Sequence, residues 1–394
     1  MGWEWREVFT GLSVKSMWSW RFARVSGIEL RVHLSFLLVI LLGAMQWGGL
    51  GVRGAIFGMV LTLLTFASVT LHELGHSLVA QAFGIPVKDI TLYPIGGVAR
   101  LGRRPQTPGQ EFLIALAGPS VNVVLGSSLY ALGLWLYSKD VLHDAVINAR
   151  SEQPTMVTLF AMLVVSNAVL AIFNMVPALP MDGGRVFRAV LSWFVGPDRA
   201  TNVSAIVARV LAVGLLSVGV FSTPANPMLV IIAMFVFVGA GQEVSEQRLG
   251  RVLDGVQVAD VVSPYAPRFT PATTLGEAVK MLTMTHYEAI AVEHFGKLQG
   301  VVTSKDILKA AGEQGAWGYV AGLVKKEVPV IDARESLEVA RFKMNEAGMP
   351  FVAVVREGLF LGLVTEMELA VVADRLSSAS FQRDGAARVG QRIA

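Results

Sequence analysis

The chain contains no cysteine among its 394 residues. Disulfide bonds and thiolate metal ligands are therefore excluded, so any bound metal must be held by His, Asp or Glu. Charge is also scarce, because Asp, Glu, Lys and Arg make up only 16% of the chain against 53% hydrophobic residues. The mean hydropathy of +0.56 is too high for a soluble enzyme.

A strong net charge is absent as well. The formal charge is +3, and the basic residues lie beside apolar runs rather than in a polybasic arm. This pattern argues against a nucleic-acid partner. The N-terminus lacks a short apolar core followed by a small-residue cleavage site, so we expect no cleaved signal peptide.

Long apolar runs occupy the first 242 positions, and each is long enough to cross a lipid bilayer. We predict spans at 33–50, 55–81, 111–137, 156–175, 203–221 and 227–242. Lys and Arg are frequent in the N-terminal segment and in the connections 82–110 and 176–202, and they are rare in the other connections. The chain is therefore expected to be a multi-pass protein of the plasma or inner cell membrane with both termini in the cytoplasm.

The regions outside the spans differ in character. Residues 1–32 are rich in Trp and Arg, which predicts an amphipathic N-terminal segment on the membrane surface. Residues 243–257 are predicted to be a linker, and residues 376–394 a polar, disordered tail. Between them, residues 258–375 hold two similar units, each predicted to contain a strand, an amphipathic helix, two short strands and another helix.

The sequence His72-Glu73-Leu74-Gly75-His76 lies in the second predicted span. On a helix the two histidines are one turn apart, so both imidazoles can share a metal ion. Ionisable side chains at membrane depth are costly and indicate a functional site. The alternative is a chance match on a buried helix of a soluble protein, with the histidines satisfied by ordinary hydrogen bonds.

A hydrolytic zinc site needs three protein ligands and one open position for water. Asp182 is the best candidate for the third ligand, because it follows Pro177 and Pro180 in a segment that cannot continue a helix. The alternative is that Asp182 caps a helix beginning near Arg185. Glu73 is then the expected general base. Asn122 of the third span is a candidate oxyanion donor or, equally, a helix–helix hydrogen-bonding residue.

Three motifs in this order resemble the site-2 protease family of intramembrane zinc metalloproteases. They are HELGH, the AGPSVN sequence ending at Asn122, and the NMVPALPMDGGR sequence containing Asp182. The resemblance covers residues 33–242 and implies that His72, His76 and Asp182 bind Zn²⁺, with Glu73 as the catalytic base and Asn122 near the substrate carbonyl. Met181 stands where the family usually has Leu. Residues 93–97 are similar to the family's membrane-dipping hairpin, which is thought to present an extended substrate.

The duplicated region resembles a tandem CBS (Bateman) module, so the expected fold is a polytopic α-helical membrane domain of about six transmembrane helices followed by an α/β CBS pair. This resemblance implies an adenine-nucleotide site (ATP, ADP or AMP) with Thr303 and Asp306, and a second with Thr365, where Glu368 replaces the usual Asp. The alternative is a docking or dimerisation module that binds no ligand. A homodimer through the CBS domains is a further expectation.

The combined prediction is a zinc metalloendopeptidase that cleaves membrane-spanning substrate proteins in the lipid bilayer and is regulated by its CBS pair. Two alternatives belong to other classes: a transporter or channel gated by CBS domains, and a catalytically inactive membrane scaffold. A transporter would be expected to show repeats among its spans, and none is found in the sequence.

Overall fold

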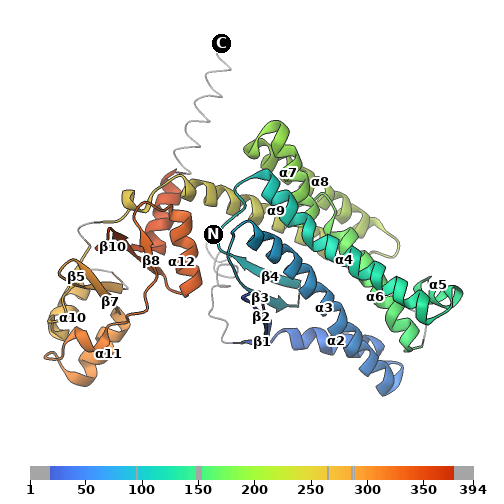
Figure 1. The fold of residues 1–394 in the computed structure, drawn as a ribbon, viewed down its shortest axis with the longest axis horizontal. Coiled ribbons are helices and arrows are strands. Elements are labelled where there is room, and N and C mark those ends of the chain that lie inside the picture. The colour runs from blue at the N-terminus through green and yellow to red at the C-terminus, as the bar shows by residue number, and fades with distance from the viewer. Residues whose placement is uncertain are drawn as a thin grey trace, which may run out of the picture. The chain divides into compact units, whose positions relative to one another are not determined.

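The computed structural model describes residues 18–94, 96–147, 153–263, 266–284, 287 and 289–376. These residues divide into an N-terminal unit that ends at Glu246 and a C-terminal unit that begins at Gln247. The N-terminal unit is helical with one small sheet, and the C-terminal unit is α/β (Figure 1). The predicted fold class is therefore confirmed. Residues 1–17 of the predicted surface segment and residues 377–394 of the predicted tail lie outside the described residues.

The helices of the N-terminal unit follow the predicted spans closely. They are α2 (Phe36–Gly48), α3 (Gly51–Ala82), α4 (Pro108–Leu136), α5 (Lys139–Ile147), α6 (Met156–Asn174), α7 (Asp182–Val195), α8 (Pro197–Phe221) and α9 (Pro227–Asp254). Five of them are long and apolar enough to cross a membrane, namely α3, α4, α6, α8 and α9.

The first predicted span, 33–50, corresponds to the shorter helix α2. Its 13 residues extend only about 20 Å at 1.5 Å per residue, whereas the hydrocarbon core is about 30 Å thick. The first residue of the predicted span, His33, ends a strand that begins at Ile28, within the predicted surface segment. In place of about six predicted spans, the described residues thus form five long apolar helices and one short apolar helix, α2, which packs against α3.

Four strands form a sheet in the order β1-β2-β3-β4 (Ser19–Val25, Ile28–His33, Val87–Tyr93 and Gly96–Leu101). β2 and β3 are parallel, and the other neighbouring pairs are antiparallel. The apolar face of the sheet packs on Ala80 of α3 and Ile114 of α4. Across the β3–β4 hairpin, Arg100 Nε donates to Asp89 Oδ1 at 2.7 Å, and Asp89 is fully buried. This ion pair joins the two strands of the hairpin, and the apolar cluster holds the sheet against α3 and α4.

Helix α9 is longer than the predicted span 227–242, because it continues to Asp254. Most of the predicted linker, 243–257, is therefore helical.

The C-terminal unit contains two repeats of the same order of elements. The first comprises β5 (Arg268–Phe269), α10 (Leu275–Met284), β6 (Ala289–His294), β7 (Lys297–Thr303) and α11 (Ser304–Gln314). The second comprises β8 (Val330–Asp332), α12 (Leu337–Ala347), β9 (Phe351–Arg356), β10 (Leu359–Thr365) and a helical segment at 366–376. Two short 3-10 turns, η2 (Val258–Asp260) and η3 (Val320–Leu323), pack with the repeat that is farther along or back in the chain. η2 comes before the first repeat but packs in the core of the second, and η3 comes after the first repeat and packs in its core.

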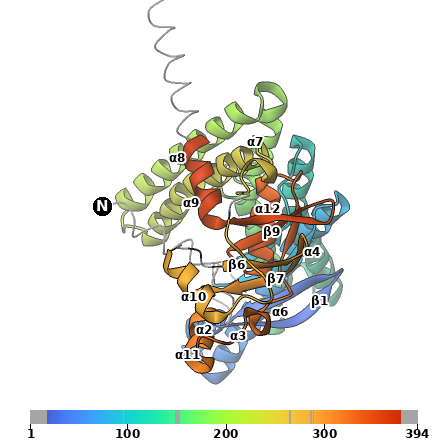
Figure 2. The same ribbon diagram turned by 90° about the vertical axis from the view of Figure 1, so that its left-hand side faces the viewer.

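Each repeat has a three-stranded sheet with its first two strands parallel and its last two antiparallel. In the first repeat, α10 and α11 pack together against the sheet through an aliphatic cluster that includes Leu275, Ile290 and Ile307 (Figure 1 and Figure 2). A third cluster, with Ala291, Val301, Phe351 and Phe360, joins the two sheets. The predicted duplication is thus a pair of like modules with a shared apolar contact.

Candidate metal centre

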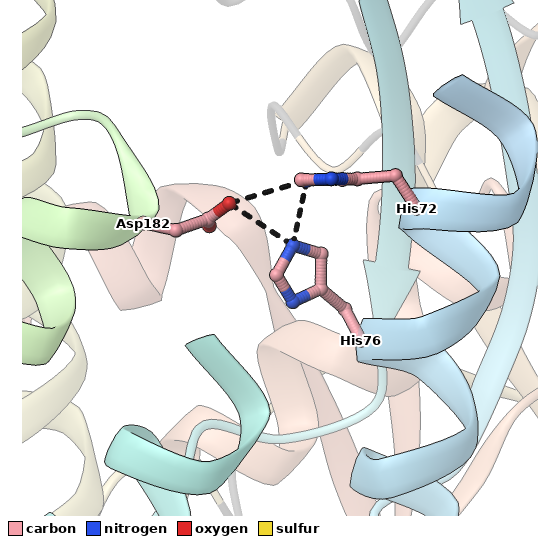
Figure 3. A group of neighbouring side chains, drawn as sticks. All are labelled: His72, His76 and Asp182. Atoms are coloured by element: carbon pink, nitrogen blue, oxygen red, sulfur yellow. Dashed lines mark hydrogen bonds and ion pairs between the residues drawn. The ribbon is translucent and has the colours of Figure 1, made fainter. Parts of the chain in front are cut away.

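The two histidines of the HELGH sequence lie on one face of α3 and point to the same place. Their ring centroids are 4.7 Å apart, and the Nε2 atoms of His72 and His76 are separated by 3.1 Å. Asp182, the first residue of α7, completes the group (Figure 3). Its Oδ2 atom lies 3.2 Å from Nε2 of His72 and 3.1 Å from Nε2 of His76. The structure therefore brings the three predicted ligands together.

The α6–α7 connection can place Asp182 there because glycines follow it. A Cβ atom on Gly183 would lie 2.3 Å from the Met175 backbone, and one on Gly184 would lie 2.4 Å from the Leu179 nitrogen. Any side chain at these positions would force the first turn of α7 away from the loop. Gly183 and Gly184 are thus required for the position of Asp182.

The size of the triangle fits a zinc ion. Ligand atoms of a tetrahedral zinc site lie about 2.0–2.1 Å from the metal, and so about 3.3 Å from one another. The observed separations of 3.1–3.2 Å match that spacing. The set of two imidazoles and one carboxylate suits zinc and leaves one of four positions open. Within the part of the chain that the structure describes, this is the group of His, Asp and Glu side chains that could hold a metal ion.

The other ring nitrogens fix which atoms face the metal. Nδ1 of His72 lies 2.5 Å from Oδ1 of Asn122, and Nδ1 of His76 lies 2.6 Å from the carbonyl oxygen of Ile114. Both oxygens are acceptors, so both Nδ1 atoms carry the proton and both Nε2 atoms keep a free lone pair. The two histidines are therefore in the tautomer that binds a metal through Nε2.

Asn122 is fully buried on α4, and both ends of its amide contact protein atoms. Oδ1 accepts from His72, and Nδ2 donates to Oδ1 of Asn167 at 2.9 Å. The structure places this amide on the ring of a metal ligand. Its role as an oxyanion donor stays a prediction, and Nδ2 would have to leave Asn167 to perform it.

Two glycines that the sequence analysis did not single out border the site. A Cβ atom on Gly118 of α4 would lie 2.2 Å from Nε2 of His76 and 2.7 Å from Nε2 of His72. A Cβ atom on Gly97 of β4 would lie 2.5 Å from Cγ of Glu73. Because Gly118 has no side chain, the space next to the two Nε2 atoms stays open, and Gly97 lets strand β4 approach Glu73. The sequence signal for Gly118 is its place in the AGPSVN motif.

Glu73 follows His72 directly on α3 and so lies next to the metal-binding group. It is partly buried between α3 and β4. A carboxylate in this position can accept a proton from a water molecule bound at the open metal position. The role of general base stays a prediction.

An ion-pair network joins α7 to its neighbours. Nε of Arg188, which is 3% exposed, donates to Glu111 of α4 at 2.7 Å. Glu243 of α9 lies 3.1 Å from Arg185 and 3.5 Å from Arg188. The network fixes α7, and with it Asp182, against two other helices. No local pattern in the sequence indicates this network, because its members are far apart in the chain.

The predicted nucleotide-contacting residues lie in the C-terminal unit and are engaged locally. Thr303 caps α11, and its Oγ1 donates to Asp306 Oδ2 at 2.7 Å. Lys325 Nζ lies 2.6 Å from the same carboxylate and is the main reason that the pKa of Asp306 is below its usual value. Thr365 and Glu368 form a reciprocal pair in which each backbone nitrogen donates to the other's side chain.

The structure distinguishes the two halves of this module. A pocket is lined by residues that include Arg268, Tyr287, Phe360, Thr365 and Glu368. Thr303 and Asp306 are not among its lining residues. The pocket therefore lies beside the threonine whose motif departs from the CBS pattern.

Comparisons with known proteins agree with this arrangement. A family model described as peptidase family M50 matches residues 60–218, and a CBS domain model matches residues 258–313, the first of the two repeats. A zinc metalloprotease of Methanocaldococcus jannaschii is 31% identical over 354 residues, covering 89% of this chain and 95% of the relative. Rip3 of Mycobacterium tuberculosis is 28% identical over 374 residues, covering 89% and 92%.

Among solved structures, the chain is similar to the site-2 protease from Methanocaldococcus jannaschii. That structure is 34% identical, and the match covers 57% of this chain and 95% of that chain, with a TM-score of 0.41.

Proposed function

The chain belongs to peptidase family M50, the site-2 protease family of zinc metalloproteases, and from this premise we propose that it cleaves membrane-spanning proteins within the lipid bilayer. The observation that carries the proposal is the triangle of His72, His76 and Asp182, whose ligand atoms are 3.1–3.2 Å apart inside a bundle of apolar helices. A hydrolytic site at this depth is suited to peptide bonds that lie in the membrane.

His72, His76 and Asp182 would hold the zinc ion. When bound, such an ion lowers the pKa of water to about 7 and polarises a carbonyl group. Glu73 accepts the proton of the attacking water and then donates it to the nitrogen of the departing amine. Asn122 and the Ile114 carbonyl keep the two imidazole rings in place while this occurs. Apart from Asp182 of α7, each of these groups belongs to α3 or α4, so the reacting geometry depends on how these three helices pack together.

Strand β4 offers a way to present the substrate. It is the last strand of the β1-β2-β3-β4 order, so one of its edges has no neighbour in the described sheet. Gly97 of this strand lies against Glu73. A helical substrate must unwind before water can reach its carbonyl, and an unwound segment could pair with this edge. We infer that β4 holds the substrate in an extended conformation beside the base.

The proposed orientation in the membrane rests on the distribution of Lys and Arg among the connections between the helices. We propose that both termini are cytoplasmic, that the protein is in the plasma or inner membrane, and that the HELGH end of α3 faces the cytoplasm. Trp18, Trp20 and Phe22 are each more than half exposed, and Trp18 is hydrogen-bonded to Leu34 just before α2. This supports the proposal that residues 1–32 lie on the membrane surface.

The C-terminal unit is proposed to sense an adenine nucleotide and to alter substrate access, and to form a homodimer. The pocket beside Thr365 is the proposed ligand site, where the exposed ring of Tyr287 could contact a base. Arg268 also lines it but is paired with Glu293 at 2.6 Å and lies over the buried ring of Phe360. A control of this kind requires that the nucleotide bind two conformations of the protein with different affinity. Adding ATP or AMP to the purified full-length protein should raise its melting temperature, and no shift at millimolar nucleotide would favour a docking module.

The proteolytic proposal is tested by coexpressing the full-length protein with candidate single-span proteins encoded nearby. Glu73→Gln should abolish the cleaved fragment and leave zinc content unchanged, because Glu73 is not a metal ligand. Asp140→Asn, an exposed acid on α5, serves as the matched control and should cleave normally. A fragment that persists in Glu73→Gln contradicts the proposal. Zinc with no cleavage of any substrate would favour a scaffold, and transport without cleavage would favour a channel or transporter.

A further inference from the structure

A chain of buried hydrogen bonds starts at the ring of His72 and crosses to α6. Oδ1 of Asn122 lies 2.5 Å from Nδ1 of His72, and Nδ2 of Asn122 donates to Oδ1 of Asn167 at 2.9 Å. Nδ2 of Asn167 donates to the Leu163 carbonyl at 2.9 Å and to the hydroxyl of Ser68 at 3.2 Å. Both amides are fully buried, so the chain has no exposed link through which water could replace a partner.

The order of donors and acceptors along these hydrogen bonds is fixed at the end that lies on α6. The carbonyl of Leu163 can only accept a hydrogen bond, so the Asn167 atom beside it must be the amide nitrogen. The oxygen of Asn167 then faces Asn122 and requires a donor there. Asn122 therefore turns its own oxygen toward His72, and that oxygen requires a proton on Nδ1. One backbone carbonyl of α6 thus decides the tautomer of a side chain on α3.

We propose that Asn167 is a positioning residue that, through Asn122, keeps the proton of His72 on Nδ1 and its Nε2 lone pair free for the metal. The inference rests on the zinc site of the proposed function. The tautomer of each histidine is then fixed by a different kind of partner. His76 donates directly to the carbonyl of Ile114, which cannot rotate, whereas His72 depends on an amide that can turn over unless Asn167 holds it.

Replacing Asn167 with leucine keeps the branched shape of the side chain and removes this restraint. The amide of Asn122 is then free to present Nδ2 to His72, and a donor at that position requires Nδ1 to be an acceptor. The proton of the ring moves to Nε2, which can no longer bind a metal. Outer-sphere partners of zinc ligands are worth about ten- to hundredfold in metal affinity. We expect Asn167→Leu to weaken zinc binding by a factor in this range.

The experiment uses the full-length protein in detergent. Its zinc dissociation constant is measured by competition with a chelator, and the histidine ring nitrogens of the zinc-free protein are observed by NMR after ¹⁵N labelling. In the wild type the His72 signal, identified with a His72→Ala variant, should be that of the Nδ1–H tautomer. In Asn167→Leu a population of the Nε2–H tautomer should appear together with the weaker affinity.

A second variant separates positioning from general damage to the helix packing. In Asn122→Asp/Asn167→Leu the carboxylate can only accept, so it holds the Nδ1 proton of His72 without help from α6. This double variant should bind zinc more tightly than Asn167→Leu alone and should show only the Nδ1–H tautomer. Thr158→Val is the matched control, because Thr158 is fully buried on the same helix and is bonded to Thr155 and Gln153 instead.

The outcomes are distinct. If Asn167→Leu lowers only the melting temperature, as Thr158→Val should, and leaves the zinc affinity and the His72 tautomer unchanged, Asn167 is structural and the inference is wrong. If the double variant is no better than Asn167→Leu, the effect does not pass through Asn122 and the inference is also wrong. If the wild type binds no zinc, or His72→Ala binds it equally well, the proposed function fails first.

Discussion

The two units of the molecule bury opposite kinds of side chain. All twelve buried polar or charged side chains among the described residues belong to the N-terminal unit, from Ser68 on α3 to Ser204 on α8. In the described part of the C-terminal unit the buried side chains are apolar, and Thr303, Asp306 and Thr365 are partly exposed. The candidate metal centre is therefore an interior feature, whereas the residues predicted to contact nucleotide lie at a surface.

The environment of each unit explains this difference. Helices in lipid face an apolar solvent, so their polar side chains are stable only where they meet one another inside the bundle. A unit in water gains stability by burying aliphatic groups and leaves its polar groups outside. Substitutions of buried residues around the metal centre should therefore affect function directly, and substitutions at the predicted nucleotide contacts should have small effects on stability.

The largest effect is expected from Gly118→Ala. The new methyl group would lie 2.2 Å from Nε2 of His76 and 2.7 Å from Nε2 of His72, in the space next to the ligand atoms. Zinc content measured by mass spectrometry of the purified protein should fall to background, and cleavage with it. Gly109→Ala on the same helix is the control, since its Cβ would meet nothing within 4 Å. A zinc-loaded Gly118→Ala protein would refute the geometry of the centre.

Gly97→Ala should separate catalysis from metal binding. Its methyl group would lie 2.5 Å from Cγ of Glu73, so the predicted base must move while the three ligands stay in place. Loss of a well-placed general base typically lowers the rate about 10²–10⁴-fold. Because Glu73 would only be displaced, the loss of rate should be near the lower end of this range. Cleavage should drop with zinc retained. A variant that cleaves at the wild-type rate would show that Glu73 does not need this contact.

Glu111→Gln tests the buried ion pair that holds α7. Arg188 is left with Glu243 at 3.5 Å as its remaining carboxylate. Breaking a buried pair costs about 3–5 kcal/mol, so the melting temperature in detergent should fall markedly. Glu246→Gln removes the exposed pair with Arg104, whose side chain is 33% exposed, and should cost about 0–1 kcal/mol. Equal effects of the two variants would mean that the network is solvated.

The smallest effect is expected from Asp306→Asn in the C-terminal unit. Lys325, and then Thr303, hold the pKa of Asp306 below its usual value, so the charged carboxylate stabilises the folded state. This contribution is present at neutral pH and is lost as the pH falls through the lowered pKa. Because both side chains are at least one-third exposed, it amounts to about 1 kcal/mol or less.

Hydrogen exchange of α11 in the full-length protein measures this effect. Protection at neutral pH should decrease in Asp306→Asn and should converge with the wild type as the pH is lowered toward 3 or below, about a unit under the usual Asp pKa. Glu313→Gln, which removes a surface contact to Lys309 on the same helix, should leave protection unchanged. A larger loss at low pH than at neutral pH would contradict the sign of the shift.

Most of the fold could be predicted from the sequence because each unit has a strong periodic or compositional signal. The spans at 111–137 and 156–175 match α4 and α6 within three residues at each end. The first span was too long, because its helix runs only from Phe36 to Gly48, and its first residue, His33, ends strand β2, which pairs with the distant β3. The extension of α9 was missed because its last turns are charged and resemble a linker.

The metal ligands were also accessible from the sequence, since His72 and His76 have a fixed spacing and Asp182 follows a break that no ordinary helix explains. The role proposed for Asn167 was not. Its connection to His72 passes through Asn122 on another helix, and nothing in its own neighbourhood of the chain indicates this. Pairings of this kind depend on how helices cross.

The sequence by itself determined which segments are long and apolar enough to cross a membrane, which residues could bind a metal, and that the C-terminal region is a duplication. These properties follow from local composition, spacing and repetition. The tertiary structure alone decided that the atoms of α3 and α7 approach within 3.2 Å, that Gly118 borders them, and that α6 supports the His72 ring. Such distances depend on the packing of whole helices, to which residues more than a hundred positions apart contribute together.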